Sequence, residues 1–322
     1  MSEKRPPLTE ALPTPRWHRW AERLIAALAF SAVLAIALIF LFIAREAIPL
    51  FFEEGVRDEM RLRDLFIPRI WDGYDEAVAI WQPIGGTPKF NMIPLFVGSL
   101  KVTILAMLIS VPLGVGCAVF VAIYAPPRIR EITKPIIELL AGVPSVVLGF
   151  FALMIVASFT QAVFGFTYRL NGVVAAIGLA ITIVPVIFTI SEDAIQAVPK
   201  SLSEAALALG ARKYQIALRV IIPAAIPGIT AAIILGFGRA IGETMIVLMA
   251  SGNAAVMEIF DFTTSVRTVT ATIAAELGEV ARGEPHWRIL FLLGVILFII
   301  TFIINLGGKM ITDRLLRKLT AG

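Results

Sequence analysis

Long apolar blocks alternate with polar segments along the chain. The apolar blocks fall at about 24–44, 95–124, 136–159, 172–190, 224–250 and 289–306. Each is close to or above the roughly 20 residues that an α-helix needs to cross about 30 Å of hydrocarbon. Because backbone groups in hydrocarbon must be satisfied internally, helices are the expected form of such segments. The pattern predicts an all-α integral membrane protein with six transmembrane helices.

The polar segments predict the domain organisation and the orientation. We expect a polar tail at 1–20, the first transmembrane helix and an external segment at 21–94, the main helical core at 95–308, and a basic C-terminus at 309–322. The first block follows a proline-rich start, so we interpret it as a retained span and not as a cleaved signal. Lysine and arginine are more frequent in the tail, at 126–134, at 199–219 and at the C-terminus than on the other side. The positive-inside rule therefore predicts that both termini are cytoplasmic.

Composition narrows the class of protein. Hydrophobic residues make up 58% of the chain and charged residues only 16%, whereas a soluble domain carries about 25% charged residues. The net charge of +4 could suggest nucleic acid, but the basic residues lie in short tracts between apolar blocks. We therefore expect membrane lipid and no nucleic acid as a partner. Cys117 is the single cysteine, so no intramolecular disulfide can form.

The chain lacks the sequence signatures of several other classes. It has no glycine-rich loop ending in Gly-Lys-Ser/Thr, so we expect no ATP binding of that kind. His18 and His286 are isolated in the sequence, and no Cys/His cluster predicts a metal site. No triad or paired-carboxylate pattern predicts a catalytic centre. We expect a protein that is not an enzyme and holds no cofactor.

The cytoplasmic segment between the fourth and fifth blocks carries the most informative motif. Small side chains leave one helix face open to a close neighbour, and a glycine then permits a turn. The segment resembles the signature of permease subunits of ATP-binding-cassette importers, which is Glu-Ala-Ala, three residues, Gly, nine residues and Ile-x-Leu-Pro. Val220 and Ile222 replace the Ile and Leu. The matching residues are Glu204, Ala205, Ala206, Gly210 and Pro223. The alternative is an amphipathic loop with chance alanines.

That resemblance implies a coupling helix, here 200–219, which docks on a cytoplasmic ATPase. Within the superfamily, the segments 141–150, 238–245 and 251–253 look like those of phosphate-specific transport (Pst) permeases, and 81–103 is similar to the PstC group. The resemblance implies the type I importer permease (MetI-like) fold in the bacterial plasma (inner) membrane. It also implies three kinds of partner subunit: a second homologous permease (PstA-like), two ATPases (PstB-like) and an external phosphate-binding protein (PstS-like).

The fifth block contains ionisable residues that suit an anion pathway. Arg239 and Glu243 are spaced i, i+4, which predicts one shared helical face, and Thr244 follows. Charges inside a membrane usually face a cavity or a partner. We expect Arg239 to present its donors to phosphate, with Glu243 holding the arginine or accepting from a protonated phosphate oxygen. The alternative is an ion pair that locks this helix to the partner permease. Lys101 is expected to extend to the headgroups.

Two other transport functions remain as alternatives. One is a permease for another oxyanion, such as sulfate or molybdate, which would share the coupling element. The other is an ion-coupled secondary carrier, whose folds often contain inverted repeats and broken helices. We find no convincing internal repeat, and such a carrier would have no use for the Glu-Ala-Ala element.

Overall fold

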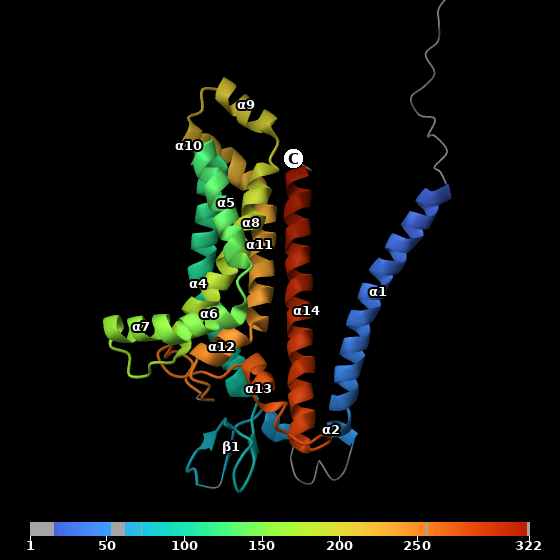
Figure 1. Ribbon diagram of the computed structural model, residues 1–322, viewed down its shortest axis with the longest axis vertical. Helices are drawn as coiled ribbons and strands as arrows, with labels where there is room; N and C mark the ends of the chain where they lie inside the picture. The colour runs from blue at the N-terminus through green and yellow to red at the C-terminus, as the bar shows by residue number, and fades with distance from the viewer. Residues whose placement is uncertain (1–15, 53–61, 72, 256, 321–322) are drawn as a thin grey trace, which may run out of the picture.

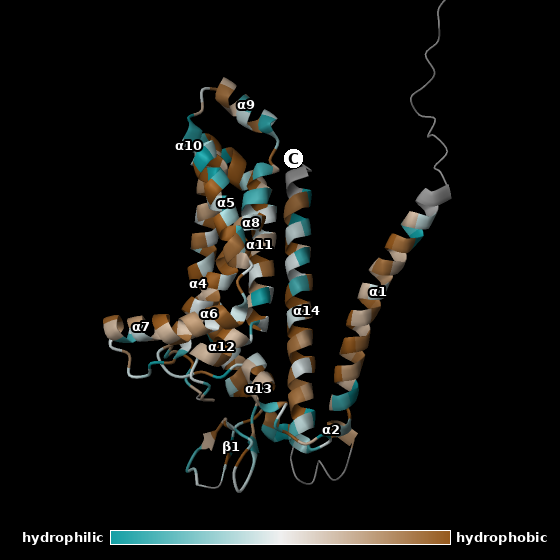
Figure 2. Cartoon of the chain, viewed as in Figure 1, coloured by the Kyte–Doolittle hydropathy of each residue, from teal (hydrophilic) through white to brown (hydrophobic). Residues whose placement is uncertain are grey.

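The computed structural model describes residues 16–52, 62–71, 73–255 and 257–320, and these residues form a helical membrane protein (Figure 1). Six helical segments are long and apolar enough to cross a membrane, as predicted. Figure 2 shows the hydrophobic residues of α1 concentrated along its middle, with hydrophilic residues nearer its ends. The six segments are Trp20–Phe52, Ile93–Tyr124, Ser145–Phe164, Gly172–Gln196, Lys213–Gly242 and Pro285–Arg317.

The longer helices run roughly parallel to one another. The Arg16 end of α1, the C-terminal end of α14 and the short helix α9 lie at the same end of the molecule (Figure 1). We call this the α9 end, and the charge pattern assigns it to the cytoplasm. The elements that build the bundle are α1 (Arg16–Ala47), α4 (Ile93–Val119), η2 (Phe120–Tyr124), α5 (Pro127–Ala141), α8 (Gly172–Gln196), α9 (Lys200–Ala208), α10 (Lys213–Ile216), η4 (Ala217–Ile221), α11 (Ile222–Gly242) and α14 (Pro285–Thr320).

Helix α8 forms the core of the bundle. Its apolar window is 61% buried, whereas that of α1 is fully unburied. Small residues let neighbouring helices approach α8 closely, as is common between membrane helices. A Cβ on Gly114 of α4 or on Gly236 of α11 would lie 2.9 Å from the side chain of Ile187. The tightly packed helices α4, α8 and α11 therefore form one rigid unit, against which α14 and then α1 are arranged.

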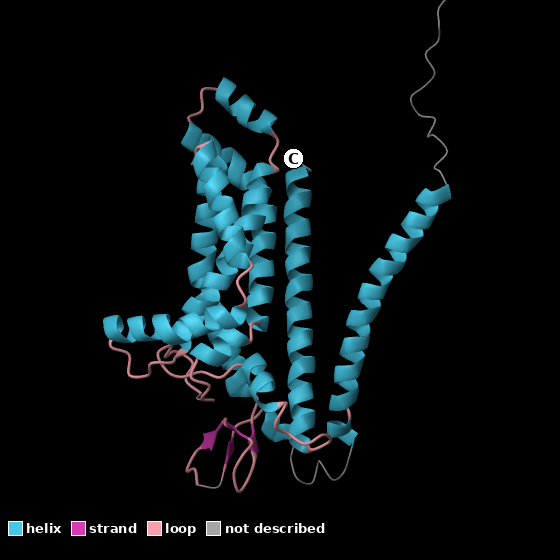
Figure 3. Cartoon of the chain, in the orientation of Figure 1, coloured by secondary structure: helices cyan, strands magenta, loops and turns pink. Residues whose placement is uncertain are grey.

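Short elements occupy the end opposite α9 (Figure 3). Two antiparallel hairpins lie there, with Arg69 paired to Val78 and Trp81 paired to Phe90. Leu65 and Met92 of this external segment are fully buried in a cluster with the first turns of α14. The short elements are α2 (Pro49–Phe52), η1 (Leu62–Leu65), β1 (Arg69–Ile70), β2 (Ala77–Val78), β3 (Trp81–Gln82), β4 (Lys89–Phe90), α12 (Met245–Ala250) and α13 (Val269–Glu276). Part of the expected external segment, 53–61, and most of the 1–20 tail fall outside the described residues.

The predicted third span, 136–159, is wrong in its boundaries. Helix α5 ends at Ala141, and a second helical run begins at Ser145 as α6 (Ser145–Phe151), continuing through η3 (Ala152–Val156) into α7 (Ala157–Phe164). Pro144 explains the break, because a proline disfavours helical backbone in the residue before it. Figure 1 shows α5 lying lengthwise in the bundle, while α6 and α7 run across its direction.

The predicted fifth span and coupling helix also need correction. The helix expected over 200–219 ends at Ala208, and Gly210 then adopts a left-handed φ of 77° that turns the chain back. Residues 213–219 belong instead to the next span, which begins at Lys213 rather than at 224. That span ends at Gly242, and the separate helix α12 follows. The sequence pattern missed the start at Lys213 because that part of the span contains charged residues, and it missed the end at Gly242 because apolar residues resume at Met245 after only Glu243 and Thr244.

Candidate functional site

Arg239 lies on α11, on a side that no helix of the described residues covers. The face of α11 that includes Gly236 and Ala240 is buried against its neighbours, whereas Leu235, Arg239 and Gly242 form an exposed stripe. Within the described residues, the Arg239 side chain has no hydrogen bond or ion pair. A charged side chain at this depth needs water, a ligand or a partner protein. The stripe is therefore placed to face a space shared with something outside the chain.

Glu243 is the residue directly after the end of α11, so the expectation that it continues the helix of Arg239 is wrong. Helix α11 ends at Gly242, and Glu243 is extended, with φ −68° and ψ 131°. One carboxylate oxygen of Glu243 accepts hydrogen bonds from the backbone N–H groups of Thr244 (3.2 Å) and Met245 (3.3 Å). Its backbone carbonyl accepts a hydrogen bond from the Thr270 hydroxyl at 2.9 Å. Glu243 therefore organises the turn between α11 and α12, directly after the helix that carries Arg239.

Thr244 is the first residue of that turn and is partly exposed. Its hydroxyl donates to the backbone carbonyl of Gly242 at 3.3 Å. The three predicted pathway residues thus lie within one helix end and one turn, with Arg239 on the last helical turn. We infer that the turn fixes where the arginine stands, because its backbone is held from both α12 and the 268–270 segment.

Helix α9 stands apart from the bundle at its cytoplasmic end (Figure 1). The helix buries no side chain, and Glu204 and Ala205 are exposed while Ala206 is partly so. Gly210 is exposed in the turn that follows, next to Leu209, which is 89% exposed. Exposed leucine beside small residues is the composition of a surface that another protein covers. The geometry leaves the whole of the Glu-Ala-Ala element free for a docking partner.

Lys101 is buried and does not extend to the headgroups as expected. Its side chain is 6% exposed, and its ammonium donates to the backbone carbonyls of Glu258 (2.6 Å) and Asp261. It also lies 5.4 Å from the centre of the Phe262 ring, within the range of a cation–π contact. The lysine therefore fastens the external loop between α12 and α13 to α4. This loop is 157 residues away in sequence, so no local pattern could have indicated the contact.

The same loop is stiffened by Asp261. Its carboxylate accepts hydrogen bonds from the Thr263 hydroxyl at 2.6 Å and the Thr263 backbone N–H at 2.7 Å. These bonds, together with the charge of Lys101, lower the pKa of Asp261 below its ordinary value. The carboxylate thus stays ionised throughout the neutral range, and the loop keeps this turn.

A second polar cluster at the external end joins three segments. Glu276 accepts hydrogen bonds from the Trp81 indole at 3.1 Å and pairs with Arg267 at 2.5 Å. His286 places a ring nitrogen 2.9 Å from the other oxygen of Glu276. His286 was expected to be isolated, and it is not, because the fold brings β3, α13 and the start of α14 together. The cluster lines a cavity of about 480 Å³ that opens toward the outside.

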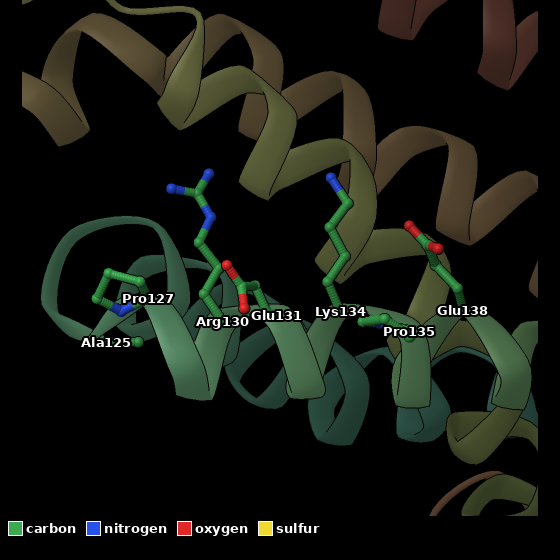
Figure 4. A pocket seen from close by; sticks show the side chains of 7 residues that line it. All are labelled: Ala125, Pro127, Arg130, Glu131, Lys134, Pro135 and Glu138. Carbon is green, nitrogen blue, oxygen red and sulfur yellow. The ribbon is translucent and has the colours of Figure 1, made fainter.

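A third polar cluster lies toward the cytoplasmic end, between α5 and α8. The carboxylate of Glu192 is fully buried, and Arg130 and Lys134 contact it at 3.1 and 2.9 Å. Figure 4 shows both cationic side chains extending to the same side of α5. The hydrogen bond to Glu192 raises the pKa of Lys134 above its ordinary 10.5. Lys134 is therefore charged at neutral pH, and its pairing with Glu192 weakens as the pH rises through that higher pKa.

The polar face of α5 also lines a hollow toward the cytoplasmic end. This hollow has a volume of about 550 Å³ and opens to the surface. Its charged lining residues are Arg130, Glu131, Lys134 and Glu138. Glu138 lies at the far end of this row (Figure 4). Since α5 is amphipathic and buries no side chain, its polar face looks into the hollow and its apolar face is exposed.

Comparison with known proteins agrees with this arrangement. Residues 110–320 match the family described as binding-protein-dependent transport system inner membrane component. The chain belongs to this family. It is therefore a multi-pass protein of the inner membrane and the membrane component of a transport system.

Several curated relatives are similar over most of their length. The probable ABC transporter permease protein YqgH of Bacillus subtilis (strain 168) is 36% identical over 234 residues, which cover 73% of this chain and 75% of that protein. The phosphate transport system permease protein PstC of Mesorhizobium japonicum is 36% identical over 243 residues, covering 70% and 73%. PstC 1 of Mycobacterium tuberculosis is 31% identical over 268 residues, covering 76% and 79%.

Solved structures share the fold. An inward-facing MetNI methionine ABC transporter matches with a TM-score of 0.55 at 20% identity, over 70% of this chain and 97% of that one. A bacterial alginate ABC transporter, solved with an alginate-bound periplasmic protein, matches with a TM-score of 0.56 at 16% identity, over 92% and 97%. These similarities confirm the predicted fold of type I importer permeases.

Lys101→Met is expected to loosen the external loop. Hydrogen bonds from a charged group contribute about 1.5–3 kcal/mol, so amide hydrogen exchange in 257–263 should accelerate by roughly tenfold or more. The measurement is exchange followed by mass spectrometry in detergent or nanodiscs. Lys89→Met is the matched control, because Lys89 contacts only its own external hairpin region, with a 3.4 Å hydrogen bond to Gln82 and a cation–π contact of 5.2 Å with the Tyr74 ring. Unchanged exchange in 257–263 would show that Lys101 does not hold the loop.

Proposed function

We propose that the chain is the permease subunit of an ATP-driven importer and forms half of the transmembrane pathway for inorganic phosphate. The observation that carries the proposal is Arg239, an exposed arginine without a partner among the described residues, inside an apolar span. Relatives that are named phosphate transport permeases support phosphate over another oxyanion. No observation specifically favours sulfate, molybdate or an ion-coupled carrier.

A guanidinium suits phosphate for a physical reason. Its planar fork of N–H groups matches two oxygens of a phosphate and stays charged at any physiological pH. Arg239 stands on the exposed stripe of α11, so a second permease could close the other side of the space it faces. In this proposal the PstA-like subunit completes the pathway, and phosphate passes between the two permeases beside Arg239.

Glu243 offers a way to favour phosphate over sulfate. One of its carboxylate oxygens is occupied by the backbone N–H groups of Thr244 and Met245. No hydrogen bond to the other oxygen occurs within the described residues. That oxygen can accept a hydrogen bond from a protonated phosphate oxygen, a group that fully deprotonated sulfate lacks. The turn geometry holds the carboxylate close to the helix end that carries Arg239.

The conformational change driven by ATP hydrolysis would reach the permease through α9. Its exposed small and leucine residues form a surface for a PstB-like ATPase, and each permease of the pair would receive one ATPase. ATP hydrolysis would then take place in those separate subunits. On the opposite end, the hairpins and the loop fastened by Lys101 form the surface on which a PstS-like phosphate-binding protein would dock.

Two variants test the pathway and the coupling surface separately. In the assembled transporter, Arg239→Gln should reduce phosphate uptake by roughly 10- to 100-fold, since a charge-assisted contact is worth about 1.5–3 kcal/mol. The complex and its ATPase subunits should remain associated. Glu204→Lys should instead weaken ATPase association and abolish uptake. Uptake and ATPase activity are measured in parallel on the purified complex. Arg239→Lys serves as an intermediate variant, because it keeps the positive charge but not the planar guanidinium. Normal uptake in both variants would overturn the proposal.

Glu243→Gln is expected to narrow the preference for phosphate over sulfate. A glutamine keeps the size of the side chain and an oxygen for the N–H groups of the turn, so uptake itself should continue. Competition of sulfate with labelled phosphate, measured in the assembled transporter, reports the preference. If sulfate still fails to compete with phosphate, Glu243 does not distinguish the two anions by accepting a hydrogen bond from protonated phosphate.

A further inference from the structure

Helix α5 is held to the rest of the chain in an unusual way. It is 15 residues long and buries none of its side chains, in contrast to α4, α8 and α11. Its two ends are joined by short breaks at 125–126 and 142–144. A helix with so little buried surface can shift relative to the core at small cost in hydrophobic burial. Apart from the packing of Ile137 against the cluster around Phe188, what holds α5 in position is therefore the polar contact on its inner face.

That contact centres on Glu192. Its carboxylate is fully buried, and each of its two oxygens has a separate cation from α5: Arg130 at 3.1 Å and Lys134 at 2.9 Å. Lys134 also reaches Asp193, which is 63% exposed, at 3.2 Å. A buried charge requires its partners far more than an exposed one does. Movement of α8 at this level must therefore carry Arg130 and Lys134, and with them α5.

The position of Glu192 along the chain places this contact between helix α9 and helix α5. Helix α8 ends at Gln196, and after Pro199 the docking helix α9 begins at Lys200. Glu192 thus lies on the last turns of α8, next to the element that would move with an ATPase. On its other side, the same contact reaches the face of α5 that lines the 550 Å³ hollow.

We propose that Glu192 is a positioning residue that transmits displacement of α9 to α5, so that the hollow beside α5 changes shape as the ATPases close. This inference rests on the proposed function, since it names the link between the ATPase surface and the pathway. Arg130 and Lys134 are the two points on α5 at which the displacement is received. The exposed Asp193 contributes little, because water competes for its contact with Lys134.

Glu192→Gln is the variant that tests this link. It removes the buried charge and keeps the size of the side chain. Arg130 and Lys134 are 37% and 33% exposed, so water can solvate them once their partner is gone. Asp193→Asn is the matched control, because it removes a neighbouring carboxylate that pairs with the same lysine from the exposed side.

The first readout is the amount of phosphate transported per ATP hydrolysed by each assembled complex. Allosteric couplings of 1–3 kcal/mol correspond to 5- to 150-fold effects, so this ratio should fall by about tenfold in Glu192→Gln while ATPase activity persists. Asp193→Asn and Glu192→Asp should keep the ratio within about threefold. If uptake and ATPase activity fall together and the ratio stays unchanged, Glu192 has only a structural role and the proposal is overturned.

The second readout follows α5 directly. In a Cys117→Ser background, Glu138→Cys places a single thiol on the hollow, and its maleimide labelling rate is measured with and without ATP. The rate should depend on ATP in the otherwise native chain and lose that dependence when Glu192→Gln is added. Retained dependence would contradict the link. If Glu192→Gln yields no complex, Lys134→Gln replaces it, because this variant leaves Arg130 to pair with Glu192. The transport ratio and the labelling rate are then measured on Lys134→Gln, and the same outcomes support or overturn the proposal.

The experiment separates this inference from the proposed function. If the native complex shows no ATP-dependent phosphate uptake, the proposed function fails before any variant is compared. If the native complex transports phosphate and Glu192→Gln transports it with an unchanged ratio and unchanged labelling, only the inference about Glu192 fails.

Discussion

A charged side chain placed among apolar helices has to meet a partner, a backbone acceptor or water. Three such side chains within the membrane segments of this protein meet the requirement in three ways. Lys101 is closed off by backbone carbonyls of an external loop, and Glu192 is enclosed by two cations of α5. Arg239 has neither, within the described residues. The first two charges hold parts of the protein together, and the third is the one left to interact with something that is not part of the chain.

The rest of the fold can be understood from where these charges stand. The close helix contacts around α8 provide a rigid reference, since Gly114 and Gly236 pack directly against the side chain of Ile187 and Gly228 packs against Ala194. On that reference, Lys101 fixes the external loop and Glu192 fixes α5. The turn at Glu243 ends α11 directly after Arg239. Family membership, the exposed α9 and the unpaired arginine then point to the same kind of machine, in which a motion at the cytoplasmic end is converted into access at the membrane.

Much of this architecture could be predicted from the sequence, because the burial of apolar residues in lipid follows local hydropathy. The number of spans, their order and the side of the Glu-Ala-Ala element depend on runs of residues and on charge bias, both of which are readable along the chain. A turn at Gly210 was expected, but the charged residues after it concealed the start of the next span at Lys213. The boundary at Pro144 was missed because apolar residues continue across it, and the one at Gly242 because only Glu243 and Thr244 separate two apolar runs. The i, i+4 argument for Arg239 and Glu243 failed for the same reason: it assumed that the helix continued past Gly242.

The polar clusters could not be predicted, because each joins segments far apart in sequence. Trp81 and Glu276 are 195 residues apart, and Arg130 and Glu192 are 62 apart. Single charges of this kind look the same in sequence whether they are solvated, paired or functional. Only the fold shows that Glu192 is enclosed while its neighbour Asp193 is exposed.

The central claim is that this chain moves phosphate only as part of an ATP-driven assembly. The most direct measurement is phosphate uptake into proteoliposomes that contain the chain with a second permease and ATPase subunits, supplied with a phosphate-binding protein outside and ATP inside. The account predicts uptake that requires enclosed ATP, the ATPase and the binding protein, and that continues when ionophores collapse all ion gradients. Uptake by this chain alone, driven by an ion gradient and indifferent to ATP, would contradict it.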